Sequence, residues 1–182
     1  SQVKTQFRGH PLHCRDLGIS SDSTDADAYV NGGPDACVEK VLDLGVRHVE
    51  LGDLTGMATP RSVRNILLDL EAKRLVPIAH FHDTRGTGLA NYVAAWEAGV
   101  RHFDSSFGGV GGHPDRVKYG GGHTGNVCTE DLVNLFESMG IDTGIDLDAL
   151  LATAELCEQA LGRELHGRVT RSGLNPLRPP PA

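Results

Sequence analysis

Long apolar runs, aromatic side chains and excess positive charge are all scarce in this sequence. No stretch approaches the roughly 20 consecutive apolar residues of a membrane-spanning helix, so we expect no contact with a membrane. Residues 1–6 lack the apolar core of a secretory signal. The net charge of −7 argues against nucleic acid as the main partner, because phosphate binding requires a basic surface.

Cysteine is also sparse, and its four residues are never spaced as CxxC. Scattered single cysteines are typical of reduced thiols in a cytoplasmic protein rather than of a disulfide framework or a zinc site. With 182 residues, 39% hydrophobic and 23% charged, the chain has the composition of one globular domain. The cysteines are Cys14, Cys37, Cys128 and Cys157.

Helix and strand patterns alternate along the chain from about residue 34. Apolar residues at i, i+3, i+4 and i+7, together with capping residues at the ends, predict the helices. Short apolar runs rich in β-branched residues predict the strands. The predicted helices cover residues 34–45, 59–70, 89–99, 130–139 and 146–161, and the predicted strands cover residues 47–51, 76–81 and 101–105.

A short internal repeat indicates how these elements are arranged. Residues 45–50 read GVRHVE and residues 99–104 read GVRHFD, with one predicted strand between them. This spacing matches strand–helix units of the length found in a (β/α)₈ barrel, so we predict an α/β fold that is part of such a barrel. A doubly wound open sheet is the alternative. The predicted strands are too few to close a barrel, so we expect a fragment or one half of a split barrel.

Three regions follow from this pattern. Residues 1–33 are unpatterned, residues 34–173 form the C-terminal part of the barrel, and residues 174–182 form a proline-rich tail that we expect to be disordered. His10 and His13 resemble a metal-binding pair, but they lie in the unpatterned region without a second pair of ligands, so we do not expect them to bind a metal.

His80 and His82 are the first candidate site residues. Residues two apart in a strand point to the same face, and the strand before this pair is apolar. The pair therefore lies at the C-terminal end of a buried strand, where barrel enzymes keep their active sites. Two imidazoles followed by Asp83 suit a divalent cation. The alternative is a pair of hydrogen-bonded polar histidines without a ligand.

Asp53 occupies the equivalent place one strand earlier. A carboxylate there could orient a ligand or transfer a proton. The alternative is an aspartate that caps the following loop.

A glycine-rich stretch covers residues 108–125 and could form a mobile lid over the site. It is not a dinucleotide-binding motif, because Pro114 interrupts it and no helix pattern opens there. Within or beside this stretch, His113 could act as an acid or base, or could be a solvated loop residue. Asn126 could offer a carbonyl oxygen to a metal.

Four motifs follow one another in order along the chain. They are ELGDLTGMATP (50–60), HFHDTRGTGLAN (80–91), GGVGG (108–112) and TGNVCTEDLV (124–133). Together they resemble the C-terminal half of the hydroxymethylglutaryl-CoA lyases, which are metallolyase barrels related to isopropylmalate synthase. The resemblance extends from about residue 36 to residue 173.

The resemblance implies a ligand set and a reaction. His80, His82 and Asn126 would coordinate Mg²⁺ or Mn²⁺, and Asp53 would act beside His80 in the catalytic cluster. The reaction would be a retro-Claisen cleavage of a 3-hydroxyacyl-CoA to acetyl-CoA and a keto acid such as acetoacetate, a step of leucine degradation. A Claisen-type synthase is the alternative within the superfamily, although residues 124–131 favour the lyase branch.

Two departures from the family pattern affect these expectations. The family loop carries a cysteine after the glycines that match Gly111 and Gly112, and this chain has His113 there, with residues 115–119 inserted. The Arg-Asp pair of the family's first strand is also absent from residues 1–35, where only Arg15-Asp16 occurs. We therefore expect a homo-oligomer or a complementary N-terminal half-barrel as partner. A catalytically incomplete chain that acts only by association is the third hypothesis.

Overall fold

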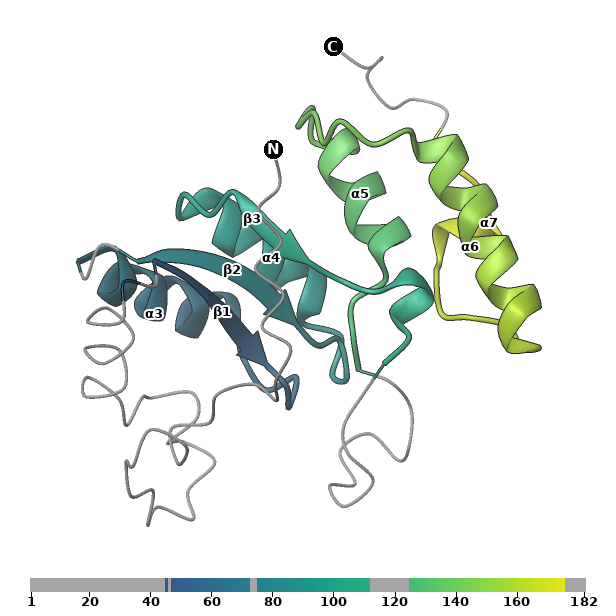
Figure 1. Cartoon of the computed structure of the whole chain (residues 1–182). Helices are drawn as coiled ribbons and strands as arrows, with labels where there is room; N and C mark the ends of the chain where they lie inside the picture. The colour runs from purple at the N-terminus through teal and green to yellow at the C-terminus, as the bar shows by residue number, and fades with distance from the viewer. Residues whose placement is uncertain (1–44, 46, 73–74, 112–124, 176–182) are drawn as a thin grey trace. The chain divides into compact units, whose positions relative to one another are not determined.

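The computed structural model describes residues 45, 47–72, 75–111 and 125–175 (Figure 1). The chain divides into two compact units, Ser1–Arg47 and His48–Ala182, and every helix and strand described below lies in the second. The predicted unpatterned region and the helix predicted for residues 34–45 lie outside the described residues, apart from Gly45.

A parallel three-stranded sheet forms the centre of the second unit (Figure 1). Its order is β1 (His48–Asp53), β2 (Val76–Phe81) and β3 (His102–Asp104). The connections are α3 (Pro60–Ala72) and α4 (Gly88–Glu97), because parallel neighbours require a crossover. Strands that follow chain order, with a helix after each of the first two, are the repeating unit of a (β/α)₈ barrel, so the predicted partial barrel is confirmed.

The core lies between the sheet and its two helices. Alternation along the strands sends Ala79 and Phe81 toward the helices, where they pack with Val63 of α3 and Tyr92 of α4. The full cluster of buried residues is Ala58, Val63, Leu67, Ala79, Phe81, Tyr92, Ala94, Ala95, Val100, Val127, Leu132 and Phe136.

The opposite face of the sheet is mainly polar. Alternation places His48, Glu50, His80, His102 and Asp104 on it, beside Val76 and Ile78 of β2, and the polar residues except the half-buried His80 are exposed. In a closed barrel this face points to the interior, where function is concentrated at the carboxyl end. The sequence therefore separates an apolar face that holds the helices from a polar face that is available for chemistry.

Three further helices follow the sheet. They are α5 (Thr129–Ser138), α6 (Leu147–Leu161) and the short α7 (Val169–Ser172). At the start of α6 the carboxylate of Asp146 accepts a hydrogen bond from the Ala149 N–H at 3.0 Å, and at its end Gly162 adopts a left-handed conformation with φ 65°. These two caps explain why the predicted bounds of α6 are accurate.

Each predicted helix and strand after residue 47 is present, with ends shifted by a residue or two. The helix α7 and the 3₁₀ turn η2 (Phe107–Gly109) were not predicted, since neither is long enough to show periodicity. Leu174, at the start of the predicted tail, packs against a small cluster formed by α5 and α6, and residues 176–182 lie outside the described residues. None of the described helices combines the length and apolar character that a membrane span requires.

Tyr92 ties the core to the strands, and its replacement by phenylalanine should lower stability. Its buried hydroxyl accepts a hydrogen bond from the Phe81 N–H at 3.0 Å and donates one to the Asp104 carbonyl. Tyr92→Phe leaves both backbone groups unpaired, so we expect the free energy of unfolding to fall by about 1–3 kcal/mol in urea titrations. Thr153→Val removes an exposed hydroxyl and is the control. An equal loss in both variants would contradict this account.

Candidate metal centre

His80 and His82 lie side by side where β2 ends. Their ring centroids are 5.4 Å apart, so both side chains leave the same face of the strand, as the spacing predicts. His82 is buried with 4% exposure, and His80 is half-buried. The pair therefore has the placement that was expected of metal ligands.

A distant segment brings Asn126 to the same place. His82 and Asn126 form an antiparallel β-bridge, and the Val127 N–H donates to the Phe81 carbonyl at 3.3 Å. Gly125 permits this approach, because a Cβ there would lie 2.7 Å from His82 Nδ1. Directly opposed residues of an antiparallel pair carry their side chains on the same side. The fold thus gathers the three predicted ligands.

The side-chain oxygen of Asn126 has no hydrogen-bond donor among the described residues, although the atom is buried. The orientation of the amide is set by its nitrogen, which donates to the Val110 carbonyl at 3.0 Å and to Ser106 Oγ at 3.4 Å. A buried carbonyl oxygen without a partner costs about 1–3 kcal/mol, and a bound ion is one of the partners that would remove this cost. One amide oxygen beside two imidazoles can bind a divalent cation.

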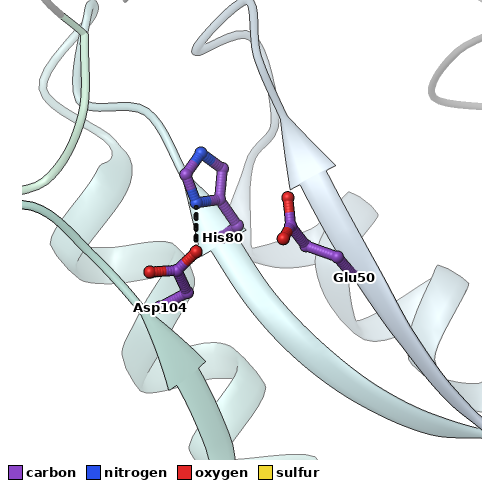
Figure 2. A group of neighbouring side chains, drawn as sticks. All are labelled: Glu50, His80 and Asp104. Atoms are coloured by element: carbon purple, nitrogen blue, oxygen red, sulfur yellow. Dashed lines mark hydrogen bonds and ion pairs between the residues drawn. The ribbon is translucent and has the colours of Figure 1, made fainter. Parts of the chain in front are cut away.

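Two carboxylates flank His80 on the neighbouring strands (Figure 2). Glu50 comes from β1 and Asp104 from β3, and one ligand atom of each lies within 4.8 Å of the others and of a ring nitrogen of His80. His80 Nδ1 is 3.3 Å from Asp104 Oδ2. In the described part of the chain this is the one group of three or more histidine, cysteine or carboxylate ligands.

The contact between His80 and Asp104 affects both residues. The hydrogen bond to Asp104 raises the pKa of His80, with partial opposition from burial, and the charge of Glu50 adds to the rise. The same hydrogen bond lowers the pKa of Asp104, which therefore stays a carboxylate at neutral pH. An ionised carboxylate can only accept hydrogen bonds, so this contact is a hydrogen bond when Nδ1 of His80 carries a proton.

Sequence reasoning missed Glu50 and Asp104 as members of the site. Both stand at the end of the repeated hexapeptide in residues 45–50 and 99–104. That repeat places an acidic residue on each of the two strands beside β2, with Asp104 paired to His80 and Glu50 paired to Ile78. The repeated hexapeptide was the signal in the sequence that could have identified these two acids. The strand order was needed to show that they flank a histidine.

The carboxylate of Asp53 is engaged by its own loop. It accepts hydrogen bonds from Thr55 Oγ1 at 3.0 Å, the Met57 N–H at 3.2 Å and the Ala58 N–H at 2.8 Å. Its backbone carbonyl accepts from the His82 N–H at 3.3 Å. Asp53 thus organises the loop before α3 and anchors the strand end beside it, which is the capping role weighed in the sequence. Its catalytic role stays a prediction.

The glycine loop is described only at its ends. Gly111 has φ 97°, and a Cβ there would lie 2.9 Å from Asn126 Nδ2, so this position requires glycine. Gly112 and His113 lie outside the described residues. The proposed contact of these three residues with substrate stays a prediction.

Two buried acidic residues at the start of α5 accept hydrogen bonds from backbone N–H groups of other segments. Glu130 is fully buried, and both of its oxygens lie 2.9 Å from the Gly108 N–H. Asp131 accepts from the Arg168 and Val169 N–H groups. Burial raises the pKa of Glu130. These contacts fix the turn that follows β3 and the start of α7.

Cys128 should be almost inert toward alkylation. Burial, together with the nearby charges of Asp131 and Glu130, raises the pKa of its thiol from 9.0 to about 12. The thiolate is the reactive form, so at pH 8 we expect iodoacetamide to modify Cys128 roughly 100-fold or more slowly than in the denatured chain, as followed by peptide mass spectrometry. The half-buried Cys157 is the internal control. Rapid modification of Cys128 in the folded chain would refute its burial.

Known proteins provide independent comparisons. The model of the family described as HMGL-like matches residues 30–157. The (R)-citramalyl-CoA lyase of Chloroflexus aurantiacus is 41% identical over 141 residues, which are 76% of this chain and 43% of that protein. A hydroxymethylglutaryl-CoA lyase of Bacillus subtilis is 42% identical over 132 residues, covering 71% of this chain and 43% of that protein.

A solved structure shows the same relationship in three dimensions. The HMG-CoA lyase from Acinetobacter baumannii, in complex with coenzyme A and 3-methylmalate, aligns with a TM-score of 0.71 at 40% identity. The alignment covers 80% of this chain and 47% of that chain, so the present chain spans less than half the length of the relatives it matches. From the matched residues, the shared fold and the identities, the chain belongs to the HMGL-like family.

Proposed function

We propose that this chain carries the divalent-cation site of an acyl-CoA carbon–carbon lyase, with hydroxymethylglutaryl-CoA as its substrate. The observation that carries the proposal is the buried Oδ1 of Asn126, which has no partner among the described residues and belongs to a residue bridged to His82 at the carboxyl ends of parallel strands. Relatives that are 41% and 42% identical to the chain over the matched residues are named as lyases of (R)-citramalyl-CoA and hydroxymethylglutaryl-CoA.

Different residues of the chain would have different roles in a retro-Claisen cleavage. His80 and His82 hold the cation through ring nitrogens, and Asn126 holds it through Oδ1. Bound Mg²⁺ or Mn²⁺ supplies positive charge that stabilises negative charge on substrate oxygens. Asp53 would orient the 3-hydroxyl group and accept its proton, and the catalytic contribution of His80 would be to hold the cation.

The cleavage requires a proton donor, and we propose that the glycine loop supplies it. When the hydroxyl oxygen forms the new carbonyl, the bond between the second and third carbons breaks, and its electron pair remains on the acetyl-CoA fragment as an enolate. A proton must then reach that carbon. By the family resemblance His113 stands where the family has a cysteine, so its imidazole would deliver that proton, and Gly111 and Gly112 would allow close approach of the backbone. The products are acetoacetate and acetyl-CoA.

A complete barrel would need strands from outside the described sheet. Among the described strands, β1 and β3 each pair only with β2, which leaves two hydrogen-bonding edges. An N-terminal half-barrel that carries an Arg-Asp pair on its first strand, or a second copy of this chain, would cover those edges. We propose the half-barrel as the partner, because the chain spans less than half of its relatives.

A direct assay tests the proposal. The full chain is incubated with Mn²⁺ and hydroxymethylglutaryl-CoA, with (R)-citramalyl-CoA, or with acetyl-CoA and 2-oxo acids. Each mixture is run with and without the N-terminal half of the Bacillus subtilis relative. Acetoacetate from the first mixture is the expected product, and pyruvate from the second alone would mean that only the substrate was misassigned.

Two outcomes would overturn the proposal. Product from the third mixture alone would mean a synthase rather than a lyase. No product in any mixture, with the complementing half present and bound, would favour a chain that acts only by association.

A further inference from the structure

The two ring nitrogens of His80 face different surroundings. Nδ1 faces Asp104 across the gap between β2 and β3, at 3.3 Å from Oδ2. Figure 2 shows the other nitrogen on the far side of the ring, directed the way the arrows of β1 and β3 point. That is the end of the sheet where His82 and Asn126 form their bridge. One nitrogen therefore contacts the carboxylate while the other is available for a ligand.

A metal requires an imidazole nitrogen without a proton. In most protein sites the other ring nitrogen donates its proton to a carboxylate or a carbonyl, which fixes the tautomer, orients the ring and increases its basicity. The contact between His80 and Asp104 has this form. The backbone of Asp104 is itself fixed, because its residue pairs with His80 in the sheet and its carbonyl accepts from the buried hydroxyl of Tyr92.

Glu50 provides the contrast. It lies on the other side of His80, on β1, and acts on the ring through its charge. A cation bound directly among Glu50, Asp104 and Nδ1 of His80 is the competing arrangement. That arrangement would use Nδ1, the nitrogen that faces Asp104, and would leave the buried Oδ1 of Asn126 without a partner among the described residues. If Asp104 instead accepts a hydrogen bond from His80 Nδ1, the other ring nitrogen is left for a cation beside His82 and Asn126. This arrangement explains both the contact with Asp104 and the buried oxygen of Asn126.

We infer that Asp104 is a positioning residue, which accepts the Nδ1–H of His80 and so keeps Nε2 unprotonated and directed at a cation shared with His82 and Asn126. The inference rests on the proposed cation site. Loss of such a supporting contact typically weakens metal binding by about 10–100-fold. We expect this loss of Mn²⁺ affinity for Asp104→Ala. Asp104→Asn keeps an oxygen that can accept the same proton and should recover part of the affinity.

Glu50→Ala is the matched control, because it removes the other carboxylate of the group. A charge that acts without a hydrogen bond at an exposed position should change the affinity by no more than about 3-fold. If Glu50→Ala weakens Mn²⁺ binding as much as Asp104→Ala, the cation is bound directly by the carboxylates and the inference is wrong. Urea unfolding of each variant shows whether the fold is kept.

A metal-free measurement separates the inference from the proposed function. The full chain is labelled with ¹⁵N-histidine, and long-range ¹H–¹⁵N spectra are recorded at about pH 9, where the rings are neutral. The His80 signals are identified by their absence in His80→Gln. We expect the wild-type ring to carry its proton on Nδ1, the Asp104→Ala ring to shift toward the Nε2–H tautomer, and the Glu50→Ala ring to remain unchanged.

The outcomes are distinguishable. An Nε2–H tautomer in the wild-type chain would overturn the inference, whatever the affinity for Mn²⁺. An Nδ1–H tautomer that depends on Asp104, in a chain that binds no Mn²⁺, would retain the orienting contact and reject the proposed cation site. The expected tautomer together with the expected affinities supports both.

Discussion

Replacing both His80 and His82 by alanine is expected to weaken Mn²⁺ binding by at least about 100-fold in calorimetric titrations of the full chain. The double variant removes two nitrogen ligands and leaves the oxygen of Asn126, which cannot hold a divalent cation alone. The wild-type chain should bind Mn²⁺ at one site. Similar weak binding by wild type and variant would mean that the three residues do not form a site in this chain.

The same sheet face offers a matched control for this experiment. His48 and His102 are also a histidine pair, with exposed rings whose centroids lie 5.5 Å apart. Replacing both by alanine removes the same number of imidazoles from the same face, but away from Asn126. We expect this control variant to keep the Mn²⁺ affinity of the wild type. An equal loss in both double variants would indicate nonspecific binding by surface histidines.

Asp53→Ala is expected to lower the free energy of unfolding by about 3 kcal/mol, because three donors lose a charged and buried acceptor. Asp53→Asn keeps one acceptor oxygen and should lose about half as much. Urea titration measures both. The control is Asp142→Ala, which removes a carboxylate that accepts only one exposed N–H, from Gly144. We expect it to change stability by less than about 1 kcal/mol.

The two roles of Asp53 can be separated by comparing stability with activity. If Asp53→Asn is nearly as stable as wild type but has no lyase activity in the complemented assay, the carboxylate takes part in the reaction. If stability and activity fall together, its function is to hold the loop and the strand end at His82. Unchanged stability in Asp53→Ala would contradict the hydrogen bonds described for the loop.

The sequence predicted the sheet and the long helices because their apolar patterns are local. Val63 and Leu67 recur at helical spacing in α3, and the run that ends at Phe81 is too short and too apolar for anything but a buried strand. The helix α7 has no such pattern. Its first N–H groups are held by the distant carboxylate of Asp131, a tertiary contact that local periodicity does not contain.

The residues of the candidate site also fall into those that local spacing predicts and those that depend on contacts between distant segments. The spacing of His80 and His82 was sufficient to place both rings on one face, because the period of a strand is two residues. The sequence offered Asn126 as a possible oxygen ligand, but only the family resemblance grouped it with the histidines, since the bridge that brings it to His82 is formed between segments far apart in the chain. Asp104 remained unnoticed because its position opposite His80 depends on the register between β2 and β3.

The most direct test is a crystal structure of the full chain soaked in Mn²⁺, with the ion located by its anomalous scattering. We expect one strong peak within about 2.0–2.3 Å of His80 Nε2, a ring nitrogen of His82 and Asn126 Oδ1, with Asp104 still bonded to His80 Nδ1. A peak among Glu50, Asp104 and His80 Nδ1, or no peak beside Asn126, would contradict the account.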